Sequence, residues 1–171
     1  MEAYTDFAYL YDTFMEDVPY EEWAEFLESL IKAYGENVKS IVDLGCGTGT
    51  ISNIMSKKGY DVTGVDYSTD MLSVAMDKAY EENAHVMYVN QDMRSLKLIN
   101  KADVIYSLCD SINYMILDKD ISSAFKSVYN NLAQDGLFIF DFNTIYKYET
   151  VIGDTTIAEN REDCSFIWEN Y

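Results

Sequence analysis

VDLGCGTGT, residues 42–50, joins a short apolar run to three glycines at alternate positions. The run over residues 40–44 predicts a buried strand, and Ile51, Ile54 and Met55 predict a helix directly after the glycines. Glycine at these positions lets a ligand approach the backbone closely, because a side chain there would block it. The spacing is G-x-G-x-G, whereas the dinucleotide fingerprint is G-x-G-x-x-G. The stretch predicts a ligand-binding turn, with an ordinary strand-to-helix turn as the alternative.

The same change of hydrophobic period recurs along the chain. Further strands are expected at residues 61–66, 86–90, 103–108 and 137–142. Helical apolar stripes are expected at three places: Trp23, Phe26, Leu27, Leu30, Ile31 and Tyr34; Leu72, Ala75, Met76 and Ala79, after a cap at Ser68; and Ile121, Ala124, Phe125, Val128 and Leu132. Strands that alternate with helices and read as continuous apolar runs predict an α/β fold with a doubly wound, mainly parallel sheet. The ligand crevice is then expected outside the carboxyl ends of the strands.

Three regions are expected within a single domain. Residues 1–36 are expected to form a helical cover, residues 37–145 the ligand-binding core, and residues 146–171 the start of a lid or of further strands. Residues 165–171 predict a strand in which the sequence stops. The fifth core strand would then be an open sheet edge, which invites self-association. We therefore expect a truncated version of a longer domain that lacks its last strands.

Composition argues against several classes of protein. The 171 residues carry a net charge of −18 and a sequence pI near 4.1, so binding to nucleic acid or to an anionic membrane surface is disfavoured. Cys46, Cys109 and Cys164 form no C-x-x-C pair, which predicts no metal site and a reduced, cytoplasmic location. The first residues lack the features of a signal peptide, and no apolar stretch approaches the roughly 20 residues that span a bilayer.

Three aspartates lie at or after the ends of the first three predicted strands, where the crevice is expected. Asp43 would oppose a pyrophosphate and attract an ammonium or sulfonium group, or else it binds neighbouring backbone N–H groups. Asp66 can accept hydrogen bonds from both hydroxyls of a ribose, or it caps the helix that starts near Ser68. Asp92 can accept a hydrogen bond from an adenine amino group, although alone it reads as a solvated loop residue. Tyr67 is placed to lie against an adenine face.

The stretches VDLGCGTG, VTGVD and QDM resemble the class I S-adenosylmethionine-dependent methyltransferase family, and the resemblance covers residues 38–142 in outline. It implies a Rossmann-like methyltransferase fold with S-adenosyl-L-methionine as the cofactor. It also implies that Asp66 binds the ribose and that Asp92 and the Met93 backbone lie at the adenine. The residues implied along the methionine part of the cofactor are Gly45, Cys46, Gly47 and Gly49 of the glycine turn, with Asp43 beside them.

The N-terminal aromatic run extends the resemblance. With Tyr11, Tyr20 and Trp23 it resembles the cofactor cover of small-molecule branches of the family. A sulfonium over aromatic faces gains about 0.5–2 kcal/mol, which would give these side chains a function. Packing of an aromatic N-terminal helix against the sheet is the alternative.

The segment after the fourth predicted strand is implied to lie near the reacting groups. The resemblance places the backbone around Cys109 near the methionyl amine, and it turns Asn113 and Tyr114 toward the acceptor. Asp110 is the candidate catalytic base or anchor for a substrate amine, with a role in holding the loop as the alternative. His85 precedes a strand and is expected at the opposite end of the sheet.

Departures from the family pattern restrict the class of compound that can accept the methyl group. Residues 109–114, CDSINY, lack the Asn/Asp-Pro-Pro-aromatic box used on exocyclic amino groups of bases, and no Pro-Cys nucleophile occurs. Basic residues are too scattered for a phosphate track. We therefore predict a methyltransferase that transfers the methyl group to a small-molecule acceptor by in-line displacement. The alternatives are a non-catalytic S-adenosylmethionine-binding module and an NAD-dependent oxidoreductase, and Asp43 and the glycine spacing disfavour the second.

Overall fold

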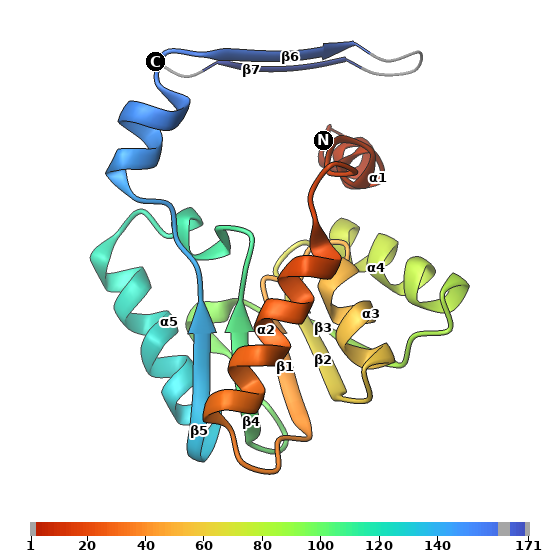
Figure 1. Ribbon diagram of the computed structural model, residues 1–171, viewed down its shortest axis with the longest axis vertical. Helices are drawn as coiled ribbons and strands as arrows, with labels where there is room; N and C mark the ends of the chain where they lie inside the picture. Colours follow the sequence, from red (N-terminus) through yellow and green to blue (C-terminus); the bar gives the residue numbers. More distant parts are fainter. Residues whose placement is uncertain (1–2, 161–164, 170–171) are drawn as a thin grey trace. The chain divides into compact units, whose positions relative to one another are not determined.

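A five-stranded parallel sheet forms the centre of the first of two units into which the chain divides, Met1–Asp141 and Phe142–Tyr171 (Figure 1). The computed structural model describes residues 3–160 and 165–169. The strands lie in the order β3-β2-β1-β4-β5, and each neighbouring pair is parallel. Their bounds are β1 Ser40–Leu44, β2 Asp61–Asp66, β3 Val86–Asn90, β4 Ala102–Ser107 and β5 Leu132–Phe140. The predicted α/β fold with a mainly parallel sheet is confirmed.

Strand β5 differs most from its predicted range. Strands β1, β2 and β3 match the prediction, and β4 begins and ends one residue earlier. Pairing of β5 begins at Leu132, opposite Ala102, and shifts register before it resumes at Leu137, opposite Val104. The residues between, AQDG at 133–136, include a left-handed Asp135 with φ 61°. A polar segment with a glycine reads as a turn, so its pairing is not visible in the hydrophobic period.

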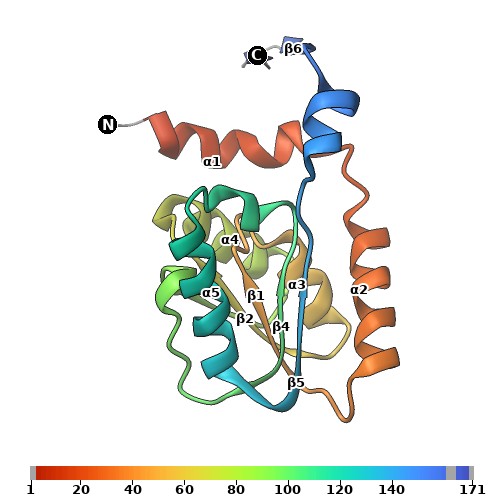
Figure 2. The same ribbon diagram turned by 90° about the vertical axis from the view of Figure 1, so that its left-hand side faces the viewer.

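Helices cover both faces of this sheet. α2 and α3 pack on one face and α5 on the other, and Figure 2 shows α2 and α5 on opposite sides. Parallel strands with continuous apolar runs require cover on both faces. The bounds are α1 Ala3–Phe14, α2 Tyr20–Tyr34, α3 Thr50–Lys57, α4 Thr69–Glu81 and α5 Asp118–Asn131, with short 3-10 turns η1 Met93–Ser95 and η2 Ser111–Tyr114.

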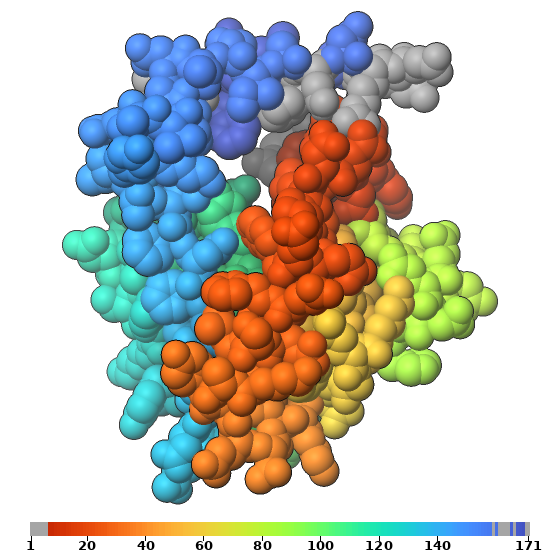
Figure 3. Space-filling view, viewed as in Figure 1, coloured from red at the N-terminus to blue at the C-terminus, as the bar shows by residue number. Residues whose placement is uncertain are grey.

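The buried side of α2 is narrower than the predicted apolar stripe. Ala24, Leu27 and Ile31 are buried in the cluster that α2 forms with the sheet. Phe26 and Tyr34, by contrast, are 66% and 73% exposed. A helix that lies on a sheet buries only one side, and Phe26 lies outside the arc that the three buried residues define. In the space-filling view α2, in orange, forms part of the molecular surface (Figure 3).

The second unit contains a π-helical turn, η3 Lys147–Ile152, and the antiparallel pair β6 Thr156–Asn160 and β7 Ser165–Glu169. The strand predicted at residues 165–171 is confirmed as far as Glu169, and its last two residues lie outside the described ones. In the first unit, β5 lies at one edge of the five-stranded sheet, and self-association through it stays a prediction. Among residues 3–160 and 165–169, no helix has both the length and the apolar character needed to cross a bilayer.

We expect Leu27→Ala to lower the free energy of unfolding by about 2–4 kcal/mol, because it leaves a cavity between α2 and the sheet. Leu27 is 1% exposed. Phe26→Ala is the matched control, since it removes a larger side chain from the exposed side, and it should cost less than about 1 kcal/mol. Urea denaturation followed by circular dichroism measures both changes. Equal losses in the two variants would contradict the orientation of α2.

Candidate active site

A cavity of about 470 Å³ lies at the carboxyl ends of β1, β2 and β4, where a doubly wound sheet places its ligand. The helix α1, the start of α2, the glycine turn, η1 and the segments after β2 and β4 all contribute to its lining. Most of the predicted site residues are brought together there: Tyr11, Tyr20, Asp43, Gly45, Cys46, Gly47, Asp66, Tyr67, Asp92, Met93, Cys109, Asp110 and Tyr114. Trp23, Gly49 and Asn113 lie outside the lining.

The turn between β1 and α3 is left-handed at Gly45, Gly47 and Gly49, with φ of 85°, 53° and 75°. Glycine adopts this conformation without the strain that a Cβ would cause. The N–H groups of Gly45 and Cys46 both donate to the Val65 carbonyl, at 2.7 and 3.0 Å, which anchors the turn to the end of β2. A Cβ at Gly47 would meet nothing within 4 Å. The backbone at Gly47 is therefore open to the approach of a ligand.

Asp66 holds the turn and starts the next helix at the same time. Its Oδ2 accepts a hydrogen bond from Gly47 N, and its Oδ1 accepts one from Ser68 N, both at 2.8 Å. The predicted cap of α4 is confirmed, because the Ser68 hydroxyl accepts a hydrogen bond from Met71 N at 3.3 Å. Each carboxylate oxygen has a further lone pair, so Asp66 retains capacity to bind a hydroxyl of a ligand.

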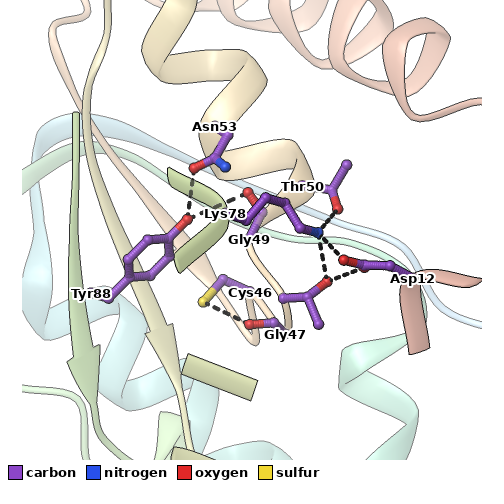
Figure 4. A network of polar contacts seen from close by, with 9 residues as sticks. Asp12, Cys46, Gly47, Gly49, Thr50, Asn53, Lys78 and Tyr88 are labelled. Carbon is purple, nitrogen blue, oxygen red and sulfur yellow. Dashed lines mark hydrogen bonds and ion pairs between the residues drawn. The ribbon is translucent and has the colours of Figure 1, made fainter. Parts of the chain in front are cut away.

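Tyr88 of β3 supports the turn at Gly49, with its hydroxyl directed toward Asn53 (Figure 4). It pairs in register with Gly64 of β2, where a Cβ would lie 2.5 Å from the tyrosine ring. The ring therefore lies over β2, and its hydroxyl donates to Asn53 Oδ1 at 2.9 Å and lies 3.4 Å from the Gly49 carbonyl. A Cβ at Gly49 would overlap the same hydroxyl. Gly49 is thus outside the lining but necessary for the shape of the turn.

Asp43 is buried beneath the turn, with 4% of its surface exposed. The Ser52 hydroxyl of α3 donates to its Oδ2 at 2.6 Å. Burial raises the pKa of Asp43 to about 7, against the opposing effect of the hydrogen bond from Ser52, and the charge of Asp66 adds to the rise. The expected negative charge at the mouth of the crevice stays a prediction, and the burial of Asp43 acts against it. Desolvation weakens that charge, and the carboxyl group ties the end of β1 to α3.

The segment after β3 contains an ion pair that the sequence analysis missed. Asp92 accepts hydrogen bonds from the backbone N–H and the Nε of Arg94, each at 2.9 Å, and the Arg94 guanidinium also reaches Asp120 of α5 at 3.5 Å. The hydrogen bond from Arg94 holds the pKa of Asp92 below its usual value. Asp92 is thus already paired with Arg94, and it lines the cavity beside Met93.

The loop after β4 has an unusual backbone. Cys109 and Asp110 are both left-handed, with φ of 57° and 53°, and Asp110 N donates to Asp141 Oδ1 at 2.9 Å. Such non-glycine conformations cost about 1–3 kcal/mol each and concentrate at functional sites. Burial, together with the charges of nearby aspartates, raises the pKa of the Cys109 thiol to about 12, so it stays protonated at neutral pH. Tyr114 lines the cavity, whereas Asn113 does not.

The helix α1 lies across the carboxyl ends of the strands and brings Tyr11 to the cavity beside Tyr20 of α2 (Figures 1 and 2). Burial raises the pKa of Tyr11 to about 12 and the pKa of Tyr20 further, so both are neutral phenols. Trp23 does not join them. It packs against the core, with its ring 6.5 Å from that of Tyr20, because its position on α2 faces the sheet. For Trp23 the structure therefore favours packing over a place in the cover.

Several lining residues carry only weak signals in the sequence: Phe7, Thr48, Thr50, Met71, Arg94 and Asp120. Thr48 and Thr50 flank the last glycine, and Arg94 follows Asp92 by two residues, so their neighbours could have indicated them. Asp120 has no such local signal. His85 is exposed just before β3 and is not part of the lining, as expected. The described residues contain no group of three or more His, Cys, Asp or Glu arranged to hold a metal ion.

We expect the difference in free energy of unfolding between the unsubstituted chain and the Asp43→Asn variant to change with pH. The carboxyl group has a pKa near 4 when unfolded and about 7 when folded, so the folded state holds the extra proton between these values. The unsubstituted chain should therefore lose stability relative to the amide variant as pH rises from about 5 to about 8, measured by urea denaturation.

Asp103→Asn is the matched control for this pH dependence. Desolvation acts to raise the pKa of Asp103, but hydrogen bonds from the N–H groups of Lys39 and Ser40 outweigh it and keep the pKa below its usual value. Asp103 is thus ionised in both the folded and the unfolded state over the same pH range. The difference in free energy of unfolding between the unsubstituted chain and Asp103→Asn should therefore stay constant. A constant difference for Asp43→Asn would contradict the raised pKa.

Comparison with known proteins gives consistent results. Residues 41–136 match the family described as "Methyltransferase domain". A protein of Geobacillus sp. (strain WCH70) that is named as a methyltransferase is 36% identical to this chain over 170 residues. The match covers 99% of this chain and 69% of that protein. A dTDP-3-amino-3,4,6-trideoxy-alpha-D-glucopyranose N,N-dimethyltransferase of Streptomyces venezuelae is 26% identical over 138 residues, covering 80% of this chain and 56% of that protein.

A solved structure is similar over nearly the whole chain. The S-adenosylmethionine-dependent methyltransferase from Clostridium acetobutylicum ATCC 824 has a TM-score of 0.84 and 32% identity, covering 98% of this chain and 68% of that one. The present chain thus spans about two thirds of the length of its more similar relatives. The glycine turn, the parallel sheet and these similarities agree. The chain belongs to the class I S-adenosylmethionine-dependent methyltransferase family, whose cofactor is S-adenosylmethionine.

Proposed function

We propose that this chain transfers a methyl group from S-adenosylmethionine to a small-molecule acceptor. The observation that carries the proposal is the cavity in which the open backbone at Gly47 adjoins the Asp66 carboxylate. A ligand that combines a ribose with an extended cationic chain fits these two groups, because Asp66 can accept from hydroxyls and the turn leaves space along the backbone.

The charges of the lining suit the cofactor. The described lining includes the carboxylates of Asp66, Asp92, Asp110 and Asp120, and its one cation, Arg94, is paired with two of them. A cavity of this sign attracts the sulfonium and ammonium groups of S-adenosylmethionine. The same charges repel the diphosphate of NAD. The oxidoreductase alternative is therefore disfavoured on electrostatic grounds, even though Asp43 contributes less charge than expected.

The following assignments to the cofactor are part of the proposal. Asp66 binds the ribose, and the segment with Tyr67, Asp92 and Met93 borders the adenine. The glycine turn, with Gly45, Cys46, Gly47 and Gly49, and the buried Asp43 beneath it, lies along the methionine part. The backbone around Cys109 lies near the amine. Their shared support is that each of these residues except Gly49 lines the cavity, and Gly49 shapes the turn.

The main task of the protein in methyl transfer is to align the two reactants. The bound cofactor supplies a methyl carbon already activated by its sulfonium, so the protein must hold the acceptor in line with it, which can contribute about 7–11 kcal/mol. Tyr11 and Tyr20 cover the site as neutral phenols, exclude water and present aromatic faces to positive charge. Asp110 is proposed to take the proton of the acceptor or to anchor its amine, beside Tyr114 and Asn113 on the acceptor side.

A small-molecule acceptor is supported by two observations. The described lining offers no free basic group for a phosphate backbone, because Arg94 is already paired with Asp92 and Asp120. The Streptomyces venezuelae relative carries an amino sugar derivative in its name as the compound it methylates. We propose a compound of metabolite size, without assigning that sugar to this chain.

Isothermal titration calorimetry tests the cofactor class. We expect S-adenosylmethionine and S-adenosylhomocysteine to bind and NAD to give no heat, because the lining favours cations over diphosphate. Tight NAD binding without binding of the sulfonium compound would sink the proposal. Single-turnover assays with a panel of small amines and alcohols then test catalysis through formation of S-adenosylhomocysteine. Cofactor binding without methylation of any acceptor would instead favour the non-catalytic binding module.

We expect Asp66→Ala to weaken S-adenosylhomocysteine binding by about 1.5–3 kcal/mol, because it removes the proposed ribose acceptor and the hydrogen bond to Gly47 N. Calorimetry measures the loss. Asp61→Ala is the matched control, since Asp61 is exposed at the other end of β2 and should leave the affinity unchanged. An unaltered dissociation constant in Asp66→Ala would remove Asp66 from the site.

A further inference from the structure

Four polar side chains from α1, the glycine turn, α3 and α4 form one connected group, which we name the polar clasp: Asp12, Thr48, Thr50 and Lys78. Figure 4 shows Asp12, Thr50 and Lys78 of this group. The Thr48 hydroxyl donates to Asp12 Oδ1 at 2.5 Å. Lys78 Nζ donates to Thr50 Oγ1 at 2.9 Å and to Thr48 Oγ1 at 3.2 Å, and it forms an ion pair with Asp12 Oδ2. The clasp thus joins the end of α1 to both sides of Gly49.

The surroundings of the clasp strengthen these contacts. The side chain of Lys78 is 17% exposed and that of Asp12 33% exposed, while Thr48 is buried. Water screens a partly buried ion pair less than a surface pair. Among the described residues, loss of Asp12 would leave Lys78 hydrogen-bonded only to the turn and α3, and loss of Lys78 would leave Asp12 with Thr48 alone, so either loss removes this polar link between α1 and α4. The clasp is therefore a more effective link than an exposed lysine–aspartate pair.

The clasp matters because little of the described part of α1 is fully buried. Among residues 7–14 of α1, Ala8 is the one that is fully buried, and Phe7 and Tyr9 are 40% and 59% exposed. The same helix supplies Phe7 and Tyr11 to the cavity lining. Tyr11 lines the cavity together with Tyr20 of α2, so the clasp holds the helix that carries one side of this aromatic pair.

We infer that Asp12 and Lys78 are positioning residues, which hold α1 and the glycine turn together over the bound cofactor and so set the rate at which it leaves. Neither side chain lines the cavity, so each acts through the elements that it joins. The inference rests on the proposed place of the cofactor in this cavity. It concerns retention of the cofactor and does not depend on which acceptor is methylated.

The test measures release of S-adenosylhomocysteine from the complete chain by stopped-flow fluorescence during displacement with excess S-adenosylmethionine. We expect Lys78→Met and Asp12→Asn to release it about three to ten times faster, with little change in the association rate. Lys78→Arg should retain most of the slow release, because it keeps the charge. The double variant that exchanges the two residues, Asp12→Lys with Lys78→Asp, should recover part of the slow release.

Lys57→Met is the matched control. It breaks another lysine–carboxylate pair, Lys57 with Glu82 at 2.7 Å, which links the end of α3 to the end of α4 outside this cavity. It should release S-adenosylhomocysteine at the unsubstituted rate. Hydrogen exchange without ligand gives a second readout, in which the amides of α1 exchange faster in Lys78→Met while those of α2 do not change.

The outcomes separate the two proposals. Release at the unsubstituted rate from Lys78→Met and Asp12→Asn, or equal acceleration by Lys57→Met, would overturn this inference while cofactor binding stands. Failure of the unsubstituted chain to bind S-adenosylhomocysteine at all would overturn the proposed function and this inference with it. If Lys78→Met does not fold, Asp12→Asn decides, because the amide matches the carboxylate in shape.

Discussion

The two hydrogen bonds accepted by the Asp66 carboxylate are the constraint on which the site depends. β1 and β2 end side by side, with Leu44 opposite Val65, so a carboxylate at the end of β2 can reach the turn that leaves β1. By binding Gly47 N and Ser68 N, it fixes the left-handed turn and the N-cap residue of α4 relative to one another. Together with the bonds from Gly45 N and Cys46 N to the Val65 carbonyl, this makes the turn a preorganised surface, which lowers the entropic cost of binding a ligand there.

Local patterns in the sequence were sufficient for most of the scaffold. The alternation of apolar runs and helical stripes predicted β1, β2 and β3 at their observed bounds, and the serine before α4 predicted its cap. These features depend on residues a few positions apart, so the hydrophobic period and the capping residues can be recognised in the local sequence. The pairing of β5 from Leu132 was missed because it depends on a register with a distant strand.

The site was predicted less completely than the scaffold, for a related reason. Which residue types gather at the carboxyl ends of the strands follows from topology, and most of the expected residues do line the cavity. The raised pKa of Asp43 and the orientation of Trp23 depend on burial, which a pattern of residues does not specify. The contact between Asp12 and Lys78 joins residues on different helices, and nothing near either in the sequence indicates its partner.

The pairing of Tyr88 with Gly64 has a consequence for how this chain can vary. A ring that lies over the neighbouring strand, and reaches α3 with its hydroxyl, needs a partner without a side chain. The volumes at the two positions are therefore complementary, and enlargement of one is tolerated only with reduction of the other. In related chains we would expect these positions to covary, as a steric pair on adjacent strands that sets the spacing between the sheet and α3.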